Sequence, residues 1–206
     1  VPILTLTANE QVTAVDAFLA HFPGLHTLQL SDFALGRVPA AVARMPHLHT
    51  LVLNRCAVAF SAESQSTLTA MAKLKILELA NNPLGSTPDL GTLPNLYLLD
   101  LSNCRLSTLP AGLAEHAQLK TLIFSDNQAS ELPEFVLHLP TQRIDGIELA
   151  GNPWSAASRE RIKARFREIG RDFGVRADAA DIALAQALFP TLDAQDASDV
   201  IYNLPG

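Results

Sequence analysis

The feature that most constrains this chain is a pattern that recurs seven times along it. Apolar residues stand at relative positions 1, 4 and 6, and Asn or Cys stands at position 9 in six of the seven units. The units begin at residues 1, 25, 48, 74, 96, 119 and 144, so they are 22 to 26 residues long. A repeat of this length predicts stacked coils, because one unit cannot bury its own apolar face and needs its neighbours to cover it.

The residue types at each position have a physical explanation. Positions 4 and 6 alternate with polar residues, as in a short strand with one buried face, and stacking would set such strands ~4.8 Å apart in a parallel sheet. Position 9 lies where the strand turns away, and an Asn amide there can bond to backbone groups of its own coil and the next. Cys56 and Cys104 replace Asn as small buried residues. Phe33 cannot, so we expect the second coil to turn differently.

Proline recurs at position 15 in four units. These residues are Pro39, Pro88, Pro110 and Pro133. Each suits the first position of a short helix or 3₁₀ turn, because the missing N–H is harmless there. The first and third units have longer helical stretches instead, the third over residues 61–73. We expect Val15, Phe18 and Leu19 of the first unit and Leu68 and Met71 of the third to face inward.

The recurring residues resemble the leucine-rich repeat family, whose consensus is L-x-x-L-x-L-x-x-N/C-x-L. The resemblance implies an α/β fold, a curved solenoid with a parallel β-sheet on its concave side and short helices or 3₁₀ turns on its convex side. We place about seven repeats in residues 1–154 and a helical C-terminal cap in residues 155–206.

The repeat ends after Trp154. Ser155 is expected to cap a helix that runs to about Ile169 and ends at Gly170. The outer face of this helix carries six basic residues, which are Arg159, Arg161, Lys163, Arg165, Arg167 and Arg171.

The basic helix does not predict a nucleic-acid or membrane site. Residues 155–176 hold 7 basic and 3 acidic residues, whereas residues 177–206 hold 5 acidic and no basic ones. We therefore expect the two segments to dock on each other, or the basic face to lie in water.

Two further helices are expected in the C-terminal segment. One is capped by Asp178 and reaches Phe189, and the other is capped by Asp193 and runs toward Asn203. Their apolar residues, Leu188 and Phe189 among them, are expected in a core.

Composition excludes several classes of protein. The 206 residues are 48% apolar and 17% charged, which excludes intrinsic disorder. No run of about 18 apolar residues could span a membrane, and the first residues lack the features of a signal peptide. The net charge of -6 argues against a general nucleic-acid binder. We expect a soluble, cytoplasmic-type protein.

No group of residues predicts catalysis. Cys56 and Cys104 both fill position 9 and lie two coils apart, roughly 10 Å, too far for a disulfide. His26 and His49 share position 2 of adjacent coils and are expected side by side, but without a third ligand they make a weak metal site. Phosphate-binding glycine loops, G-x-S-x-G and H-E-x-x-H are absent from the sequence. We expect no enzyme activity, cofactor or metal.

The remaining candidate is the outward face of the strands. Positions 2, 3, 5, 7 and 8 should point outward, and in the central coils they form an apolar and aromatic group rimmed by charges, as in a protein-binding hot spot. Alternatively, the β-branched residues simply tolerate a wet sheet face. The predicted protein-binding residues are Val52, Asn54, Arg55, Lys75, Ile76, Glu78, Tyr97, Leu98, Asp100, Lys120, Ile123 and Asp126.

Three segments extend the resemblance to the repeat regions of bacterial secreted effectors and toxin-like proteins. They are VDAFLAHFPGLHTLQL, NNPLGSTPDLGTLPNLYLLDLSNC and AGNPWSAASRERI. Many such proteins carry a separate ubiquitin-ligase domain of the novel bacterial type, in which the cysteine of a C-x-D motif carries ubiquitin. Neither Cys56 nor Cys104 lies in that motif, so the resemblance implies that this chain is the substrate-recognition part and acts inside a host cell.

The sequence therefore predicts a non-catalytic module that binds a protein partner, which the resemblance implies is a host protein. The alternative is a structural or autoinhibitory scaffold that packs against another domain of the same longer protein. Because Val1 already occupies position 1 of a repeat, we expect the chain to be an excised piece of a longer protein.

Overall fold

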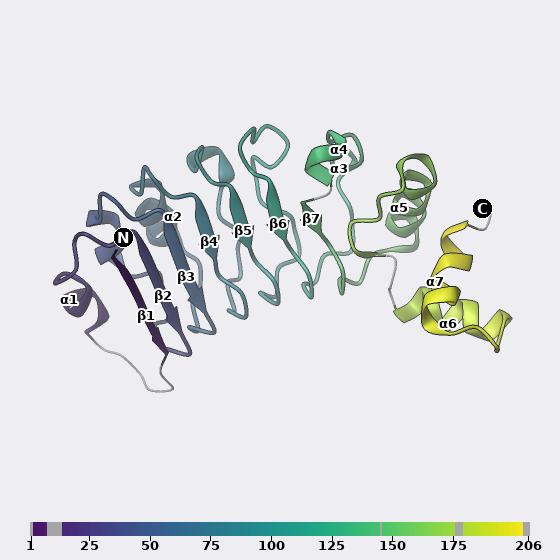
Figure 1. Cartoon of the computed structure of the whole chain (residues 1–206), viewed down its shortest axis with the longest axis horizontal. Coiled ribbons are helices and arrows are strands. Elements are labelled where there is room, and N and C mark those ends of the chain that lie inside the picture. Colours follow the sequence, from purple (N-terminus) through teal and green to yellow (C-terminus); the bar gives the residue numbers. More distant parts are fainter. Residues whose placement is uncertain (1, 8–13, 145, 176–178, 204–206) are drawn as a thin grey trace.

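Seven parallel strands form one sheet whose order follows the sequence (Figure 1). In this computed structural model the described residues are 2–7, 14–144, 146–175 and 179–203, with the backbone alone for 144, 179–181, 198 and 201–203. The strands are β1 (Ile3–Thr7), β2 (Thr27–Ser31), β3 (Thr50–Asn54), β4 (Ile76–Glu78), β5 (Leu98–Asp100), β6 (Thr121–Ile123) and β7 (Ile147–Glu148). The predicted α/β solenoid with a parallel sheet is confirmed.

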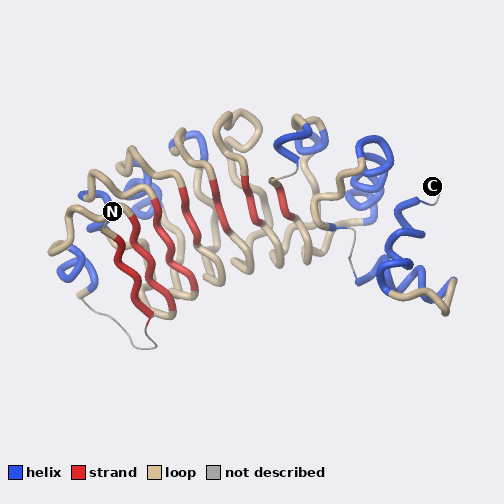
Figure 2. Tube along the Cα trace, viewed as in Figure 1, coloured by secondary structure: helices blue, strands red, loops and turns tan. Residues whose placement is uncertain are grey.

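Helices and loops connect each strand to the next and lie on the other side of the stack (Figure 2). They are α1 (Val15–Leu19), the 3₁₀ helix η1 (Ala40–Arg44), α2 (Ala62–Thr69), the 3₁₀ helix η2 (Leu90–Thr92), α3 (Glu134–Leu137) and α4 (Thr141–Ile144). The molecule is arched, and α5 (Ala156–Ile169), α6 (Ala179–Leu188) and α7 (Ala194–Asn203) gather at its C-terminal end.

The core is a continuous column of side chains from repeat positions 1, 4 and 6. The position-4 leucines of the five central coils are all 0% exposed: Leu28, Leu51, Leu77, Leu99 and Leu122. Each such burial contributes about 1.5–3 kcal/mol relative to an exposed side chain. Leu4 and Leu6 are only half-buried, because β1 is the edge strand of the sheet.

The asparagines at position 9 tie neighbouring coils together. The Asn82 Oδ1 accepts the backbone N–H groups of Cys56 (2.9 Å) and Val58 (3.0 Å), and its Nδ2 donates to the carbonyls of Leu53 and Leu79 (both 2.7 Å). Asn127 repeats this arrangement in full, and Asn152 repeats it with one accepted N–H group, that of Ala129. The predicted bonds within the coil and to a neighbouring coil are confirmed. The neighbour is the preceding coil and not the next, because the asparagine side chain points toward the preceding coil.

Cysteine at position 9 reproduces half of this arrangement. The Cys104 Sγ donates to the Leu79 carbonyl at 3.1 Å, and Leu79 occupies the same repeat position as the carbonyl partner of an Asn Nδ2 group. A thiol offers only a weak acceptor, so the two backbone N–H groups that an asparagine would bind must find other partners. The N–H of Leu84, for example, donates to the Asn82 carbonyl at 2.9 Å.

The turn after each strand depends on position 8 more than on position 9. Five residues at position 8 have a positive φ between 52° and 64°: Asp32, Arg55, Asn81, Asn103 and Asp126. The second coil keeps this left-handed residue despite Phe33, so the prediction that it turns differently is wrong at this point. The coils with Cys are the ones that differ, since Ala57 and Arg105 at position 10 also have positive φ.

Two predictions about the connecting segments need correction. Pro39 and Pro133 were predicted at the first helical position but are the N-caps of η1 and α3, one residue before the helix begins, with extended ψ angles of 127° and 137°. A missing N–H is equally harmless there. In α1, Leu19 is buried as predicted, but Phe18 is 44% exposed and its ring lies 5.2 Å from that of Phe22. A single helical turn buries one narrow face, and Leu19 occupies it.

The C-terminal helix begins and ends as predicted. Ser155 Oγ accepts the N–H of Ser158 at 3.2 Å, and Gly170 takes the left-handed conformation (φ 72°) after Ile169. Trp154 is 3% exposed, and its Nε1 donates to the Leu149 carbonyl at 3.0 Å. The helix therefore closes the last coil as a cap.

The basic face of α5 is less exposed than predicted. Lys163 is 7% exposed, and its Nζ pairs with Glu160 at 3.2 Å. Arg161 pairs with Glu134 of α3 at 2.8 Å. We expected α5 either to dock on the last segment or to present its basic face to water. The structure shows contact between α5 and α7 of that segment.

Both further helices form. The Asp193 Oδ1 accepts the Asp196 N–H at 2.9 Å as a cap of α7, whereas Asp178 lies outside the described residues. Leu188 (59% exposed) and Phe189 (46%) do not lie in a core. That prediction is wrong, because α6 packs on α7 through the face that holds Ala185.

Candidate protein-interaction surface

The outward side chains of the strands form one surface, which we call the sheet face. The strands pair position by position, so Ile76 lies opposite Leu98 and Glu78 opposite Asp100. Backbone bonds continue this register to position 2, where the Tyr97 N–H donates to the Lys75 carbonyl at 2.7 Å. Side chains at one repeat position are therefore neighbours in a row across the sheet.

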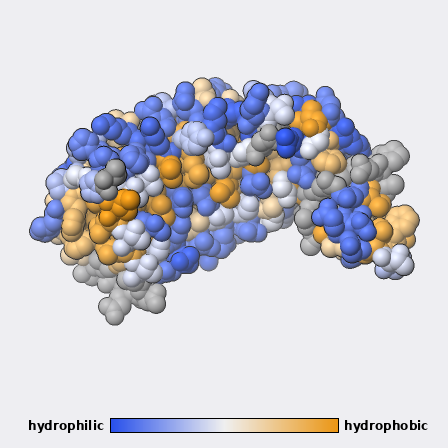
Figure 3. All heavy atoms as spheres, viewed as in Figure 1, coloured by the Kyte–Doolittle hydropathy of each residue, from blue (hydrophilic) through white to orange (hydrophobic). Residues whose placement is uncertain are grey.

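Apolar and aromatic side chains gather in the centre of the sheet face. Ile76, Leu98 and Ile123 are each partly exposed, and Tyr97 is 52% exposed. Figure 3 shows a row of apolar side chains over the strands, between hydrophilic ones, and a second apolar group at the N-terminal coil. Solvent-accessible Ile, Leu and Tyr on three adjacent strands can bury apolar area against another molecule.

Charges of opposite sign lie on the two sides of this centre. Lys75 and Lys120 at position 2 are exposed, and among the described residues neither forms an ion pair. Asp100 at position 5 is fixed, because its Oδ1 accepts both the N–H (2.9 Å) and the hydroxyl (2.7 Å) of Ser102. Three residues of strand span ~10 Å, so the surface has a basic side and an acidic side.

Not every predicted contact residue is accessible. Val52 is 6% exposed, so its prediction as a surface residue is wrong; Gln29 and Glu78 lie beside it in register. Asn54 is partly buried and links coils, since its Oδ1 accepts the Ala80 N–H at 2.9 Å and its Nδ2 donates to Glu78 at 3.3 Å. Asn54 thus fixes Glu78 and adds little surface of its own.

Arg55 and Asp126 lie apart from this centre, on the turns that follow the strands. The Arg55 guanidinium makes a two-pronged contact with the Asp32 carboxylate, with Nη2 donating to Oδ2 at 3.0 Å. This hydrogen bond lowers the pKa of Asp32 and raises that of Arg55. The structure therefore brings together eight of the predicted residues on coils four to six: Lys75, Ile76, Glu78, Tyr97, Leu98, Asp100, Lys120 and Ile123.

A group of three histidines adjoins the sheet face at coils two and three. His26 and His49 are neighbours as predicted, with ring centroids 5.8 Å apart. His47 was missed, because it lies outside the repeat positions, yet it stacks on His26 at 5.5 Å. Burial, followed by the charges of His47 and His49, lowers the pKa of His26. Within the described part of the chain, no three metal-ligating side chains are arranged to hold an ion.

Both cysteines are free and buried. Burial raises the pKa of the Cys56 thiol and raises that of Cys104 to about 11. A buried thiol with a raised pKa is the opposite of an activated nucleophile. Their hydrogen bonds to carbonyls at the turn give both residues a structural role.

Comparisons with known proteins agree with the repeat and the fold. The Leucine Rich Repeat family model matches residues 95–115. Internalin C2 from Listeria monocytogenes has a similar structure, with 26% identity over 64% of this chain and a TM-score of 0.51, and the match spans 54% of that chain. Human 5T4 (Wnt-activated inhibitory factor 1, trophoblast glycoprotein) is similar over 94% of this chain and 76% of its own, with 23% identity and a TM-score of 0.67. No curated protein matches by sequence.

These findings define the class of protein. The stacked parallel coils and the outward sheet face are those of a leucine-rich repeat solenoid. The Leucine Rich Repeat family model matches the fifth coil, in agreement with this fold. Among the helices of the described residues, none has the length and apolar character needed to cross a membrane.

Proposed function

We propose that the sheet face of coils four to six binds a protein partner and that no chemical step takes place on it. The observation that carries the proposal is the group formed by Ile76 and Leu98, which are paired across β4 and β5, by the half-exposed ring of Tyr97, and by Ile123 on the next strand. Exposed aromatic residues next to apolar ones are typical centres of binding energy in protein interfaces. In this proposal Tyr97 is the main anchor.

The charges around the anchor give the partner an orientation. Lys75 and Lys120 flank Tyr97 on the basic side, and Glu78 and Asp100 form the acidic side. A partner with the complementary arrangement gains in association rate and specificity, while the wrong orientation places like charges together. The hydrogen bonds from Ser102 keep Asp100 in one conformation, so little side-chain entropy is lost when a partner binds.

A photo-crosslinking experiment tests the proposal and identifies the partner. A benzoylphenylalanine residue at Tyr97 should crosslink one protein from a host-cell lysate, and the same group at Ala40, on the other side of the coil, should not. With the partner purified, Tyr97→Ala should weaken binding by about 10- to 100-fold. Gln118→Ala is the matched control, since Gln118 is an exposed amide of the segment before β6 and does not occupy an outward strand position. Equal crosslinking from both positions would refute the proposal.

The same experiment separates the alternative function. A scaffold that packs against another domain of its own polypeptide would crosslink only that domain, supplied in trans, and no other protein. In that case Asp100→Lys would change the stability of the longer protein. Crosslinking of lysate proteins would stay at background with and without the substitution.

We further propose that the partner is a host protein and that the chain is the recognition part of a longer bacterial effector. Residues 1–154 would bind, and residues 155–206 would cap the repeat. The resemblance of three segments to effector repeats supports this proposal, as does the similarity to a bacterial internalin. Ubiquitin transfer to the crosslinked partner by the longer protein, lost on Tyr97→Ala, is the expected result. Transfer unaffected by the substitution would contradict the link to substrate selection.

A further inference from the structure

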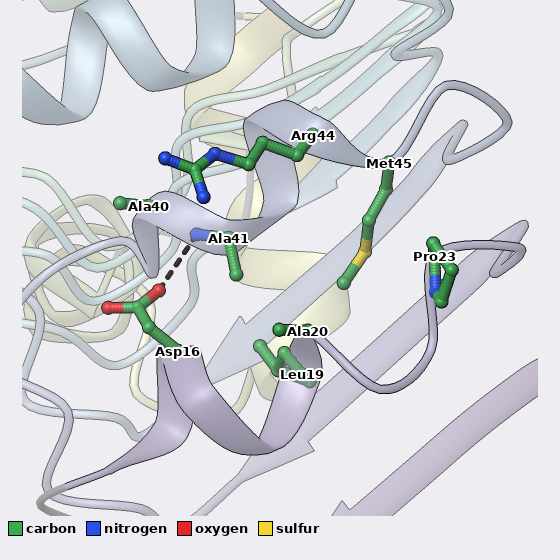
Figure 4. Close-up of a pocket in the computed structure, with 8 residues that line it drawn as sticks. All are labelled: Asp16, Leu19, Ala20, Pro23, Ala40, Ala41, Arg44 and Met45. Carbon is green, nitrogen blue, oxygen red and sulfur yellow. Dashed lines mark hydrogen bonds between the residues drawn. The ribbon is translucent and has the colours of Figure 1, made fainter.

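A groove opens between α1 and η1, on the side of the coils away from the sheet face (Figure 4). Its volume is about 410 Å³, within the ~300–1,000 Å³ range of small-molecule sites. The residues that line it are Asp16, Leu19, Ala20, Pro23, Ala40, Ala41, Arg44 and Met45. Six of these eight are apolar, so the groove can hold a hydrocarbon body.

Small side chains and one hydrogen bond keep the groove open. Leu19 (0% exposed) and Met45 (5%) form the floor, and alanines on both walls leave the space above it. The Asp16 Oδ1 accepts the Ala41 N–H at 2.8 Å across the groove, as Figure 4 shows. This bond holds the two walls at a fixed distance.

The charges at the groove favour an anion. The Asp16 carboxylate is compensated, because it also pairs with Arg37 at 2.8 Å. Arg44 is exposed and forms no ion pair within the described residues, and its side chain extends back along η1 at the rim (Figure 4). One positive charge therefore remains beside an apolar groove. A guanidinium binds a carboxylate through two parallel hydrogen bonds.

We propose that this groove binds a small amphipathic carboxylate, with its hydrocarbon part over Leu19 and Met45 and its carboxylate on Arg44. The site is separate from the sheet face, and its occupancy does not depend on the protein partner. Binding is reversible and involves no chemical step.

A titration with sodium octanoate, followed by amide NMR on the whole chain, tests the proposal. We expect saturable shifts at Ala20, Ala40 and Ala41. Octylammonium, with the same tail and the opposite charge, should bind at least tenfold more weakly. Arg44→Gln should weaken octanoate binding about three- to tenfold. Arg159→Gln, a change of a helical arginine at the other end of the molecule, should leave it unchanged.

A groove-filling variant gives the second test. Ala40→Leu changes an exposed residue on the wall, so it should leave the fold intact and abolish the octanoate shifts. Equal affinity for octanoate and octylammonium, or shifts that persist in Ala40→Leu, would overturn the proposal. Shifts at these amides that depend on protein concentration without octanoate would also overturn it, since a second copy of the chain would then fill the groove.

Discussion

Removal of the Asn82 amide tests how the coils are held together. The Asn82 side chain is 2% exposed and accepts two backbone N–H groups of the preceding coil, from Cys56 and Val58. In Asn82→Ala both donors lose their partner inside the protein. A buried donor left without a partner costs about 1–3 kcal/mol. Because some water can enter the space vacated by the amide, we expect the free energy of unfolding to fall by about 2–4 kcal/mol.

Asn82→Cys divides this loss into two parts. The thiol can donate to the Leu53 carbonyl, as the Cys104 Sγ does to Leu79 at 3.1 Å, but it cannot replace the acceptor oxygen. We therefore expect Asn82→Cys to recover only part of the stability lost in Asn82→Ala. The difference in free energy of unfolding between the two variants measures the bond donated to the Leu53 carbonyl. The loss that remains in Asn82→Cys measures the two backbone N–H groups left without an acceptor.

Urea unfolding is the assay, with the fluorescence of Trp154 as the probe. Trp154 is the single tryptophan of the chain and is 3% exposed, so its emission reports unfolding of the C-terminal coils. Circular dichroism followed in parallel shows whether the coils unfold together, which the derived free energies require. Gln118→Ala is the control and should change stability by less than about 0.5 kcal/mol. A loss below about 1 kcal/mol in Asn82→Ala would refute this account of the asparagine ladder.

Three shorter predictions concern other buried or crowded groups. The thiols of Cys56 and Cys104 should resist iodoacetamide at pH 8 in the folded chain and react once urea unfolds it, and labelling of the native protein would contradict their burial. Because the folded-state pKa of His26 lies below its ordinary value of 6.5, the unfolded chain binds more protons between those two pKa values. Stability should thus fall as the pH drops through this window. His26→Gln should reduce the fall between pH 7.5 and 5.5, measured by urea unfolding, and an unchanged fall would exclude His26 as its source. A Cβ on Gly146 would lie 1.6 Å from the Lys120 carbonyl oxygen, so Gly146→Ala should cost more than about 2 kcal/mol, and a melting temperature equal to that of the wild type would contradict this.

The stack of coils was predictable because periodicity alone determines it. A leucine at position 4 has one burial environment in every coil, so Leu51 and Leu99 follow from the same argument, and both are 0% exposed. The cap helix was equally predictable, since Ser155 and Gly170 mark its ends by their own backbone preferences. These features depend on residues near one another in sequence.

The exposure of the sheet face was harder to predict, because it depends on the lengths of side chains in neighbouring coils. Val52 and Ile123 have the same repeat position and similar chemistry, yet Val52 is buried and Ile123 is partly exposed. Val52 lies between Gln29 and Glu78 in the register of the sheet, whereas Ile123 lies between Asp100 and Glu148. A single repeat unit contains no information about its neighbours. Only a comparison of aligned positions across three coils would reveal that Val52 is buried.

The same reasoning explains why the histidine group was only half predicted. His26 and His49 share a repeat position, so the alignment places them together. His47 reaches His26 from outside the repeat, along the segment that leads into β3, where loop length sets the position of each side chain. Groups that include residues of the connecting segments, as this group and the groove at Arg44 both do, are therefore the features of this fold that periodicity leaves undetermined. In a repeat protein such features make one coil different from another. A ligand can bind at one specific coil only if the coils differ, because a strictly periodic surface offers the same contact at every coil.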